Sequence, residues 1–183
     1  MTVNFELEDD LWWKTEVNLP SWRGFQSMNG PYGAKDSDIP SNGNVTIIFA
    51  PEGRDIEPLS NEEIKSVVWV VENEEPLAKY LLSSLVNVYP SLQKNYGYTE
   101  QEKIEFMPNV NTQDDFRNLI GLHSVNVHPL KKDGIPYVGF EFGCTWDSEH
   151  GLGVLMHGNR VVEIGEADTA IYLWIAEEDA KNP

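Results

Sequence analysis

The spacing of hydrophobic positions changes along the chain and separates three parts. In residues 1–58, short runs of aromatic and β-branched residues predict strands at 11–17 and 45–49. A Gly-, Pro- and Asn-rich stretch over 26–44 lies between these runs and predicts turns. The first part is therefore expected to be rich in β-structure.

Residues 59–119 follow the helical period. Ser60 and Glu63 have the spacing of a capping box, in which each side chain accepts from the other residue's backbone N–H. Two apolar stripes follow, each typical of one face of a helix: Ile64, Val67, Val68 and Val71, then Leu77, Leu81, Leu85 and Val88. Pro90 is expected to end or kink the second helix because it lacks an N–H. A short third helix is predicted at 113–118.

Residues 120–183 alternate with the period of strands. Strands are expected at 122–127, 136–146, 152–157 and 160–164. Asp133-Gly134 and Gly158-Asn159 have the composition of tight hairpin turns, so successive strands should pair antiparallel. A terminal helix is predicted with Asp168 as its N-cap, and its buried stripe would comprise Ile171, Trp174 and Ile175.

These patterns predict an α+β fold in a single domain over residues 1–183. An antiparallel β meander would pack against helices on one face, and the N-terminal part would be β-rich. A chain of this length buries roughly 70% of its unfolded surface, which is enough for a core without disulfides. The N-terminus carries no basic, apolar leader, and no apolar run approaches the roughly 20 residues that span a membrane. Together with the single cysteine, this favours a cytoplasmic location.

The charge of the chain narrows its possible partners. The sequence has 30 Asp plus Glu against 13 Lys plus Arg, a net charge of −17. Such a charge repels nucleic-acid phosphates and anionic membrane surfaces, so neither is expected as a partner. It favours a basic protein instead, because opposite charges steer two proteins together. The acidic residues form several clusters, and one of these is the tail cluster Glu177, Glu178 and Asp179.

The densest unusual run lies in the third part. It reads Cys144-x-Trp146-Asp147-x-Glu149-His150-Gly151-x-Gly153 and continues through His157, Arg160-Val161 and Gly165-x-Ala167-Asp168. Over about residues 137–170 this block resembles an uncharacterised family of bacterial domains of unknown function with a Cys-x-Trp-Asp-x-Glu-His-Gly-x-Gly signature. Such relatives are similar to proteins of toxin–immunity loci, so the resemblance implies an inhibitor of a toxin domain. It brings no assignment of catalytic residues.

Two carboxylates and an imidazole gather in the loop predicted at 147–151. Asp147, Glu149 and His150 could hold a metal ion or supply a general base. Alternatively, Asp147 accepts backbone N–H groups in a turn, and neighbours hold the other two side chains. Their spacing matches no established ligand motif, and His157 lies at the far end of the next predicted strand. Neither a metal nor a cofactor is therefore expected.

Cys144 and Arg160 each have a chemical and a structural interpretation. Cys144 shares a predicted strand face with two phenylalanines, which is typical of a small buried hydrophobe; a nucleophile paired with His150 is the alternative. Arg160 should face His157 across the Gly158-Asn159 turn. Its guanidinium could clamp a ligand carboxylate or pair with an acidic neighbour.

Three functions are consistent with these features. The first is an acidic cytoplasmic binding protein of the immunity type, an inhibitor of a basic toxin domain. The second is a small hydrolase or metal-dependent enzyme that uses the acid–imidazole loop; it is less favoured because the sequence shows neither a pocket nor a perturbed pKa. The third is an interaction scaffold, in which Trp12, Trp13 and Trp22 would anchor an interface if they were exposed.

Overall fold

The computed structural model describes residues 3–27 and 39–182, so part of the turn-rich stretch predicted at 26–44 lies outside the described residues. The strands are β1 (Glu6–Glu8), β2 (Trp12–Asn18), β3 (Asn44–Phe49), β4 (Ile120–Lys132), β5 (Ile135–Cys144), β6 (Asp147–His157) and β7 (Arg160–Gly165). The α-helices are α1 (Asn61–Glu72), α2 (Glu74–Tyr96), α3 (Glu100–Phe106) and α4 (Leu173–Lys181). Short 3-10 helices are η1 (Pro20–Trp22), η3 (Gln113–Asn118) and η4 (Ala167–Ala170).

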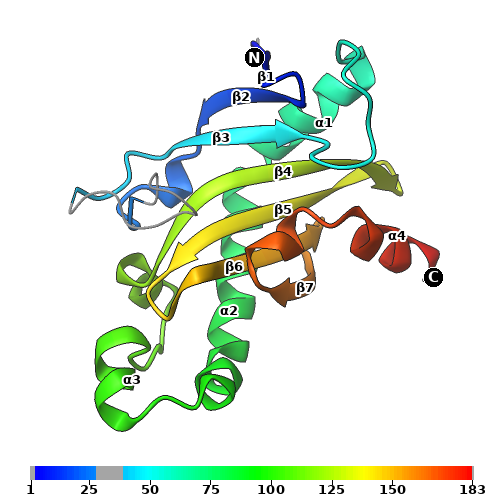
Figure 1. Cartoon of the computed structure of the whole chain (residues 1–183). Coiled ribbons are helices and arrows are strands. Elements are labelled where there is room, and N and C mark those ends of the chain that lie inside the picture. Colours follow the sequence, from blue (N-terminus) through cyan, green and yellow to red (C-terminus); the bar gives the residue numbers. More distant parts are fainter. Residues whose placement is uncertain (1–2, 28–38, 183) are drawn as a thin grey trace.

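The strands form one seven-stranded sheet in chain order, β1 to β7 (Figure 1). Strands β4 to β7 are an antiparallel meander, as predicted, and the predicted α+β class is confirmed. Asp133 and Gly134 join β4 to β5 with φ angles of 53° and 78°, the conformation of a tight hairpin turn. Strand β3 pairs parallel with β4, because the helices α1 to α3 carry the chain back along the sheet between them.

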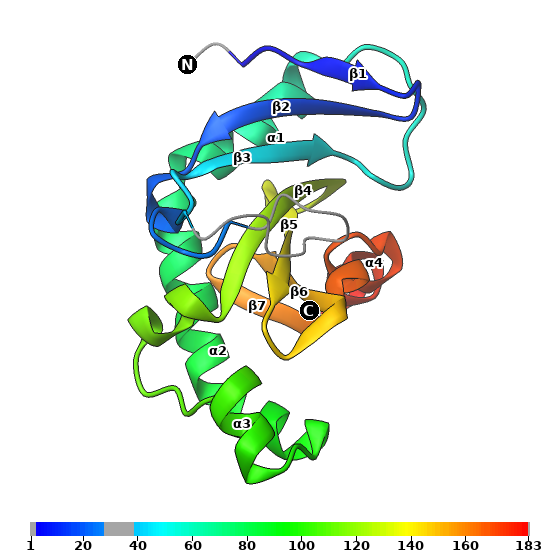
Figure 2. The same ribbon diagram turned by 60° about the vertical axis from the view of Figure 1, so that its left-hand side comes forward.

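Helices cover both faces of the sheet, whereas the sequence predicted helices on one face only. Helices α1 and α2 pack on the face of β5 that carries Val138 and Phe140. Helix α4 lies on the other side of the sheet (Figure 1, Figure 2). It packs there through Ala176 on Tyr137 and Leu155. The prediction was wrong because neighbouring strand residues face opposite sides, and here both sides of β5 are apolar.

The helical part follows its local signals except at Pro90. Ser60 and Glu63 form the predicted capping box at the start of α1. Pro90 does not end α2, which continues to Tyr96. A proline inside a helix costs about 3 kcal/mol, and the helix nevertheless continues past it, with the preceding residue, Tyr89, buried in the core. The sequence prediction also missed α3, which begins with a second capping box. Among the helices of the described residues, none is both long enough and apolar enough to cross a lipid bilayer.

Two predictions in the third part are wrong. The segment 147–151 is the beginning of β6 and not a loop, so the turn after β5 consists of Thr145 and Trp146 only. The terminal helix is divided into η4 and α4, and Glu166 rather than Asp168 is the N-cap residue of η4. Trp174 is 54% exposed, because the face of α4 that meets the sheet is the one with Ala176.

The tryptophans proposed as interface anchors differ in exposure. Trp22 is fully buried and packs against Phe25 and Phe142, so it cannot anchor an interface. Trp12 and Trp13 are both half-buried. The indole of Trp13 donates to main-chain carbonyls in the segment between β3 and α1.

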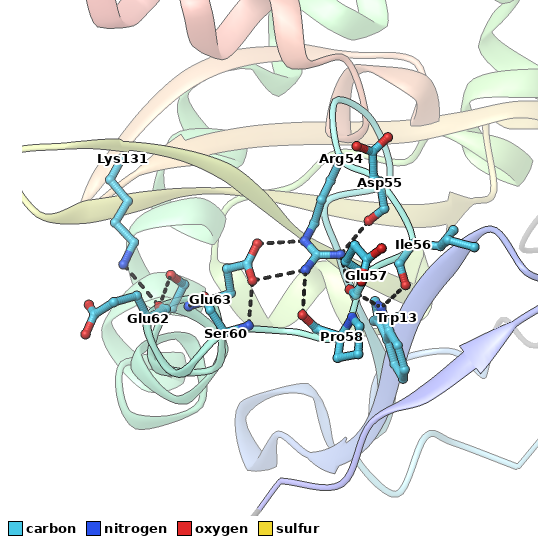
Figure 3. A network of polar contacts seen from close by, with 11 residues as sticks. Trp13, Arg54, Asp55, Ile56, Glu57, Pro58, Ser60, Glu62, Glu63 and Lys131 are labelled. Atoms are coloured by element: carbon cyan, nitrogen blue, oxygen red, sulfur yellow. Dashed lines mark hydrogen bonds and ion pairs between the residues drawn. The ribbon is translucent and has the colours of Figure 1, made fainter.

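Arg54 holds the segment between β3 and α1 in place (Figure 3). Its guanidinium donates to both carboxylate oxygens of Glu63, at 2.6 and 3.1 Å, and to the carbonyls of Asp55, Glu57 and Pro58. The Arg54 hydrogen bonds, together with those from Ser60, hold the pKa of the Glu63 carboxyl at about 2, although burial opposes this shift. One side chain thus fixes the loop and the start of the helix together.

We expect Arg54→Lys to lower the free energy of unfolding by about 2 kcal/mol at pH 7, because lysine keeps the charge and loses the planar fork. In the wild type, the pair stabilises the fold above the ordinary Glu pKa of 4.5, and this contribution is lost as the pH falls toward 2. The variant should therefore lose less stability than the wild type over that pH range. Urea unfolding followed by circular dichroism at several pH values measures both effects.

Lys65→Ala is the matched control. Lys65 pairs with Glu62 on the exposed surface of α1, where an ion pair contributes about 0–1 kcal/mol. Equal losses for Arg54→Lys and Lys65→Ala would contradict the role given to Arg54.

Candidate functional site

The backbone of η4 lies directly on the sheet because two sheet positions have no side chain. Gly139 on β5 and Gly153 on β6 point to the face that α4 also covers. A Cβ at Gly139 would lie 1.8 Å from the carbonyl oxygen of Ala170, and one at Gly153 would lie 2.3 Å from that of Glu166. We call this contact the glycine seat of η4. A glycine at each of these positions permits the close backbone approach.

A histidine strengthens the glycine seat from the neighbouring strand. His128 on β4 is 1% exposed, and its Nε2 lies 3.0 Å from the carbonyl oxygen of Ala170. Burial lowers the pKa of His128, so the neutral ring donates this hydrogen bond through Nε2–H. This histidine is therefore a structural residue of the seat.

The seated helix completes an acidic pocket. Glu166 and Asp168 come from η4, Glu141 comes from β5, and Glu149 and His150 come from the start of β6. Together with Ala167 they line a surface pocket of about 260 Å³. Glu141 also accepts a hydrogen bond of 2.9 Å from the hydroxyl of Ser124. Four carboxylates around one small volume favour a cationic group in it.

Asp147 organises one wall of this pocket. Its Oδ1 accepts from the backbone N–H of His150 at 2.9 Å and lies 3.1 Å from the Nδ1 of the same residue. Its Oδ2 accepts from the hydroxyl of Tyr96 at 3.0 Å. The pKa of Asp147 lies below its ordinary value. Burial alone would raise this pKa, but the hydrogen bonds from His150 and Tyr96 stabilise the carboxylate more strongly. The same contact with Asp147 raises the pKa of the exposed His150.

The turn before Asp147 is fixed by the helical part. The hydroxyl of Tyr98 donates to the carbonyl of Trp146 at 2.6 Å, and the Trp146 ring packs edge-on against Tyr89. The hydroxyl of Thr145 donates to the carbonyl of Phe106 at 2.6 Å. Trp146 is therefore a core residue that anchors the turn, and α2 and α3 hold the start of β6.

Cys144 lies beneath this turn and has the environment of a structural thiol. Its side chain is buried in the main core, and its Sγ lies 3.5 Å from the carbonyl oxygen of Asp147. Burial raises the pKa of the Cys144 thiol to about 12. A thiol with this pKa is almost fully protonated at pH 7, and a protonated thiol is a poor nucleophile.

His157 and Arg160 lie at the other end of β6 and are not part of the pocket. They face each other across the turn to β7, as predicted. Arg160 donates to both carboxylate oxygens of Asp179 on α4, at 2.9 and 2.6 Å, and Tyr137 donates to the same carboxylate. His157 stacks on Tyr137 with ring centroids 4.6 Å apart. This end of the hairpin attaches α4 to the sheet.

The signature residues thus belong to three places: the wall of the pocket, the turn between β5 and β6, and the attachment of α4 to the sheet. Of the seven candidates, Glu149 and His150 line the pocket, and Asp147 holds His150. Sequence reasoning missed Glu141, Glu166 and Tyr96, which come from three other elements and carry no local signal. Within 3–27 and 39–182, no three or more His, Cys, Asp or Glu side chains are grouped so that they could hold a metal ion.

A family model described as a domain of unknown function, DUF6985, matches residues 13–172. Neither the search of curated proteins nor that of solved structures gives a match. The match includes every residue of the pocket and nearly all of the sheet.

We expect Gly139→Ala to lower the free energy of unfolding by about 3 kcal/mol, because the new methyl group meets main-chain atoms of η4 that cannot move aside cheaply. Gly134→Ala is the control: nothing lies within 4 Å of that position, and its φ of 78° is the only source of strain. We expect it to cost about 1 kcal/mol. Equal losses in urea unfolding would contradict the glycine seat.

We expect the imidazole of His150 to titrate above its ordinary pKa of 6.5 in the wild type, because Asp147 favours the charged ring. Asp147→Asn removes the charge and should lower the pKa of His150. Tyr96→Phe keeps that charge and should leave the pKa of His150 raised. An NMR titration of the imidazole protons measures the pKa of His150 in all three proteins. An unchanged pKa of His150 in Asp147→Asn would contradict its pairing with Asp147.

Proposed function

The chain belongs to a family of domains of unknown function, DUF6985, and on this premise we propose that it is an acidic binding protein whose partner is a basic protein domain. One observation carries the proposal: four acidic residues from β5, β6 and the start of η4 line one surface pocket. Such a pocket suits a lysine or arginine side chain of a partner. Charge complementarity would determine both the specificity of the interaction and its rate of association.

The charge balance of the whole chain supports this proposal. With 30 acidic and 13 basic side chains, pairing every basic residue internally would still leave 17 carboxylates without a cation. The ion pairs Lys65–Glu62, Lys103–Glu100 and Arg117–Asp114 each join neighbours three residues apart within one helix, and they leave the rest of the acidic surface untouched. The remaining negative field extends about one Debye length, roughly 8 Å in physiological salt. A basic partner would therefore be attracted before contact.

The finer form of the proposal is an immunity-type inhibitor of a toxin domain. The resemblance of the signature block to proteins of toxin–immunity loci supports it. A toxin domain that acts on nucleic acid has a cationic active site, and an acidic inhibitor can occupy such a site in place of the phosphates. Such a role would place the protein in the cytoplasm, where its toxin acts.

A hydrolase is the second candidate, and one contact favours it. His150 is held by Asp147 beside the pocket, as a general base is held by its orienting carboxylate. Cys144 does not complete such a site because its thiol is buried and protonated. An enzyme of this kind would lose its activity in His150→Ala while keeping its fold.

We expect the tagged protein to retain a basic protein from a lysate of the cells that produce it at low salt, and to release it at roughly 0.5 M salt. At that ionic strength the Debye length falls to a few Å and the attraction is screened. The affinity of the isolated pair should then weaken at least tenfold between the two salt concentrations. Isothermal titration calorimetry measures this change.

The control for this experiment is Glu141→Gln with Glu166→Gln, which removes two pocket charges without a large change of shape. We expect weaker binding at low salt and a smaller salt dependence than in the wild type. Binding that is insensitive to salt, or a partner that is itself acidic, would contradict the proposed function.

A further inference from the structure

Two aromatic rings are exposed side by side where η4 passes into α4. Tyr172 is 37% exposed and Trp174 is 54% exposed. Their ring centroids lie 6.3 Å apart at an angle of 34°. Aromatic rings are often the anchors of protein interfaces, because they bring a large contact area at a small cost in side-chain entropy. The pair therefore has the composition of an interaction surface.

Acidic residues lie beside Tyr172 and follow Trp174 along α4. The hydroxyl of Tyr172 donates to Asp168 at 3.1 Å. This hydrogen bond, with the negative charge of Asp168 and those of Glu52 and Glu166, raises the pKa of Tyr172. On α4, the acidic residues of the tail cluster follow Trp174: Glu177 and Glu178 stand three and four positions after it, which puts them on the same side of the helix.

We propose that the aromatic pair Tyr172 and Trp174 is the docking site for arginine side chains of the basic partner. The proposal rests on the proposed function and gives its interface a place and a chemistry. A guanidinium stacks on an aromatic face and donates from its edges, so one arginine can lie on Trp174 and pair with a neighbouring carboxylate at once. A lysine ammonium is more strongly hydrated and gains less from such a surface.

Charge complementarity selects this occupant. A second copy of the chain would bring the same acidic residues to the same surface, and two chains of net charge −17 repel each other. A basic partner instead gains attraction from every carboxylate around the rings. Asp168 accepts from the hydroxyl of Tyr172 and also lines the acidic pocket, so the two surfaces are continuous. One arginine-rich segment can therefore reach both.

Hydrogen bonds hold both ends of the helix that carries the aromatic pair. This favours binding, because few side chains and little backbone have to become ordered on contact. Glu52 accepts the backbone N–H of Leu173 at 2.9 Å at the start of α4. Arg160 and Tyr137 hold Asp179 near its end. The glycine seat holds η4 just before the pair. The rings are therefore presented from a helix that is fixed at both ends.

The test compares two peptides, nona-arginine and nona-lysine, binding to the full chain. We expect the wild type to bind nona-arginine about fivefold more tightly than nona-lysine, which corresponds to about 1 kcal/mol for stacking on an exposed aromatic ring. Trp174→Leu keeps every charge and should abolish this preference. Calorimetry at low salt gives the dissociation constants, and circular dichroism shows that the variant keeps its fold.

Tyr80→Leu is the matched control. Tyr80 is 44% exposed on α2, which lies on the opposite face of the sheet, and this variant should keep the preference for arginine. A wild type that binds both peptides equally, or a preference that survives Trp174→Leu, would overturn the docking site and leave the proposed function standing. A wild type that binds neither peptide would overturn both.

Discussion

The close contact between η4 and the sheet determines where the acidic pocket and the exposed aromatic pair lie. The carbonyls of Glu166 and Ala170 occupy the space that side chains at Gly153 and Gly139 would fill. A larger residue at either glycine would lift η4 from the sheet. The carboxylates of η4 would then move away from those of β5 and β6, and the acidic pocket would not form. The chain downstream, including the exposed aromatic pair, would lose its position as well.

The two ends of β6 have different roles around this contact. At its start, Asp147 is fixed by Tyr96 and in turn holds His150 at the pocket. At its end, the hairpin with β7 brings Arg160 to Asp179 and attaches α4. A block that is continuous in sequence therefore forms part of the acidic pocket and also attaches α4 to the sheet. This explains why its residues do not converge on one point.

Local chemistry made much of the fold predictable, and long-range contacts made the rest unpredictable. The capping box at Ser60 and the turn at Asp133 involve residues close in sequence, so their patterns could be read directly. The parallel pairing of β3 with β4 depends on residues far apart in the chain. The same holds for Tyr96, which reaches Asp147 across 51 positions. Trp174 is exposed because α4 packs on the sheet through its other face. The sequence of the helix alone does not reveal which face that is.

The most direct test of the account is an NMR titration of the full chain with nona-arginine. Backbone amide and tryptophan indole N–H signals report each region separately. We expect the signals of the Trp174 indole and of the amides of η4, α4 and the start of β6 to shift together and to saturate at one peptide concentration. Shifts confined to other acidic regions, such as β1 or the start of α1, would contradict it. The binding surface would then lie away from the glycine seat.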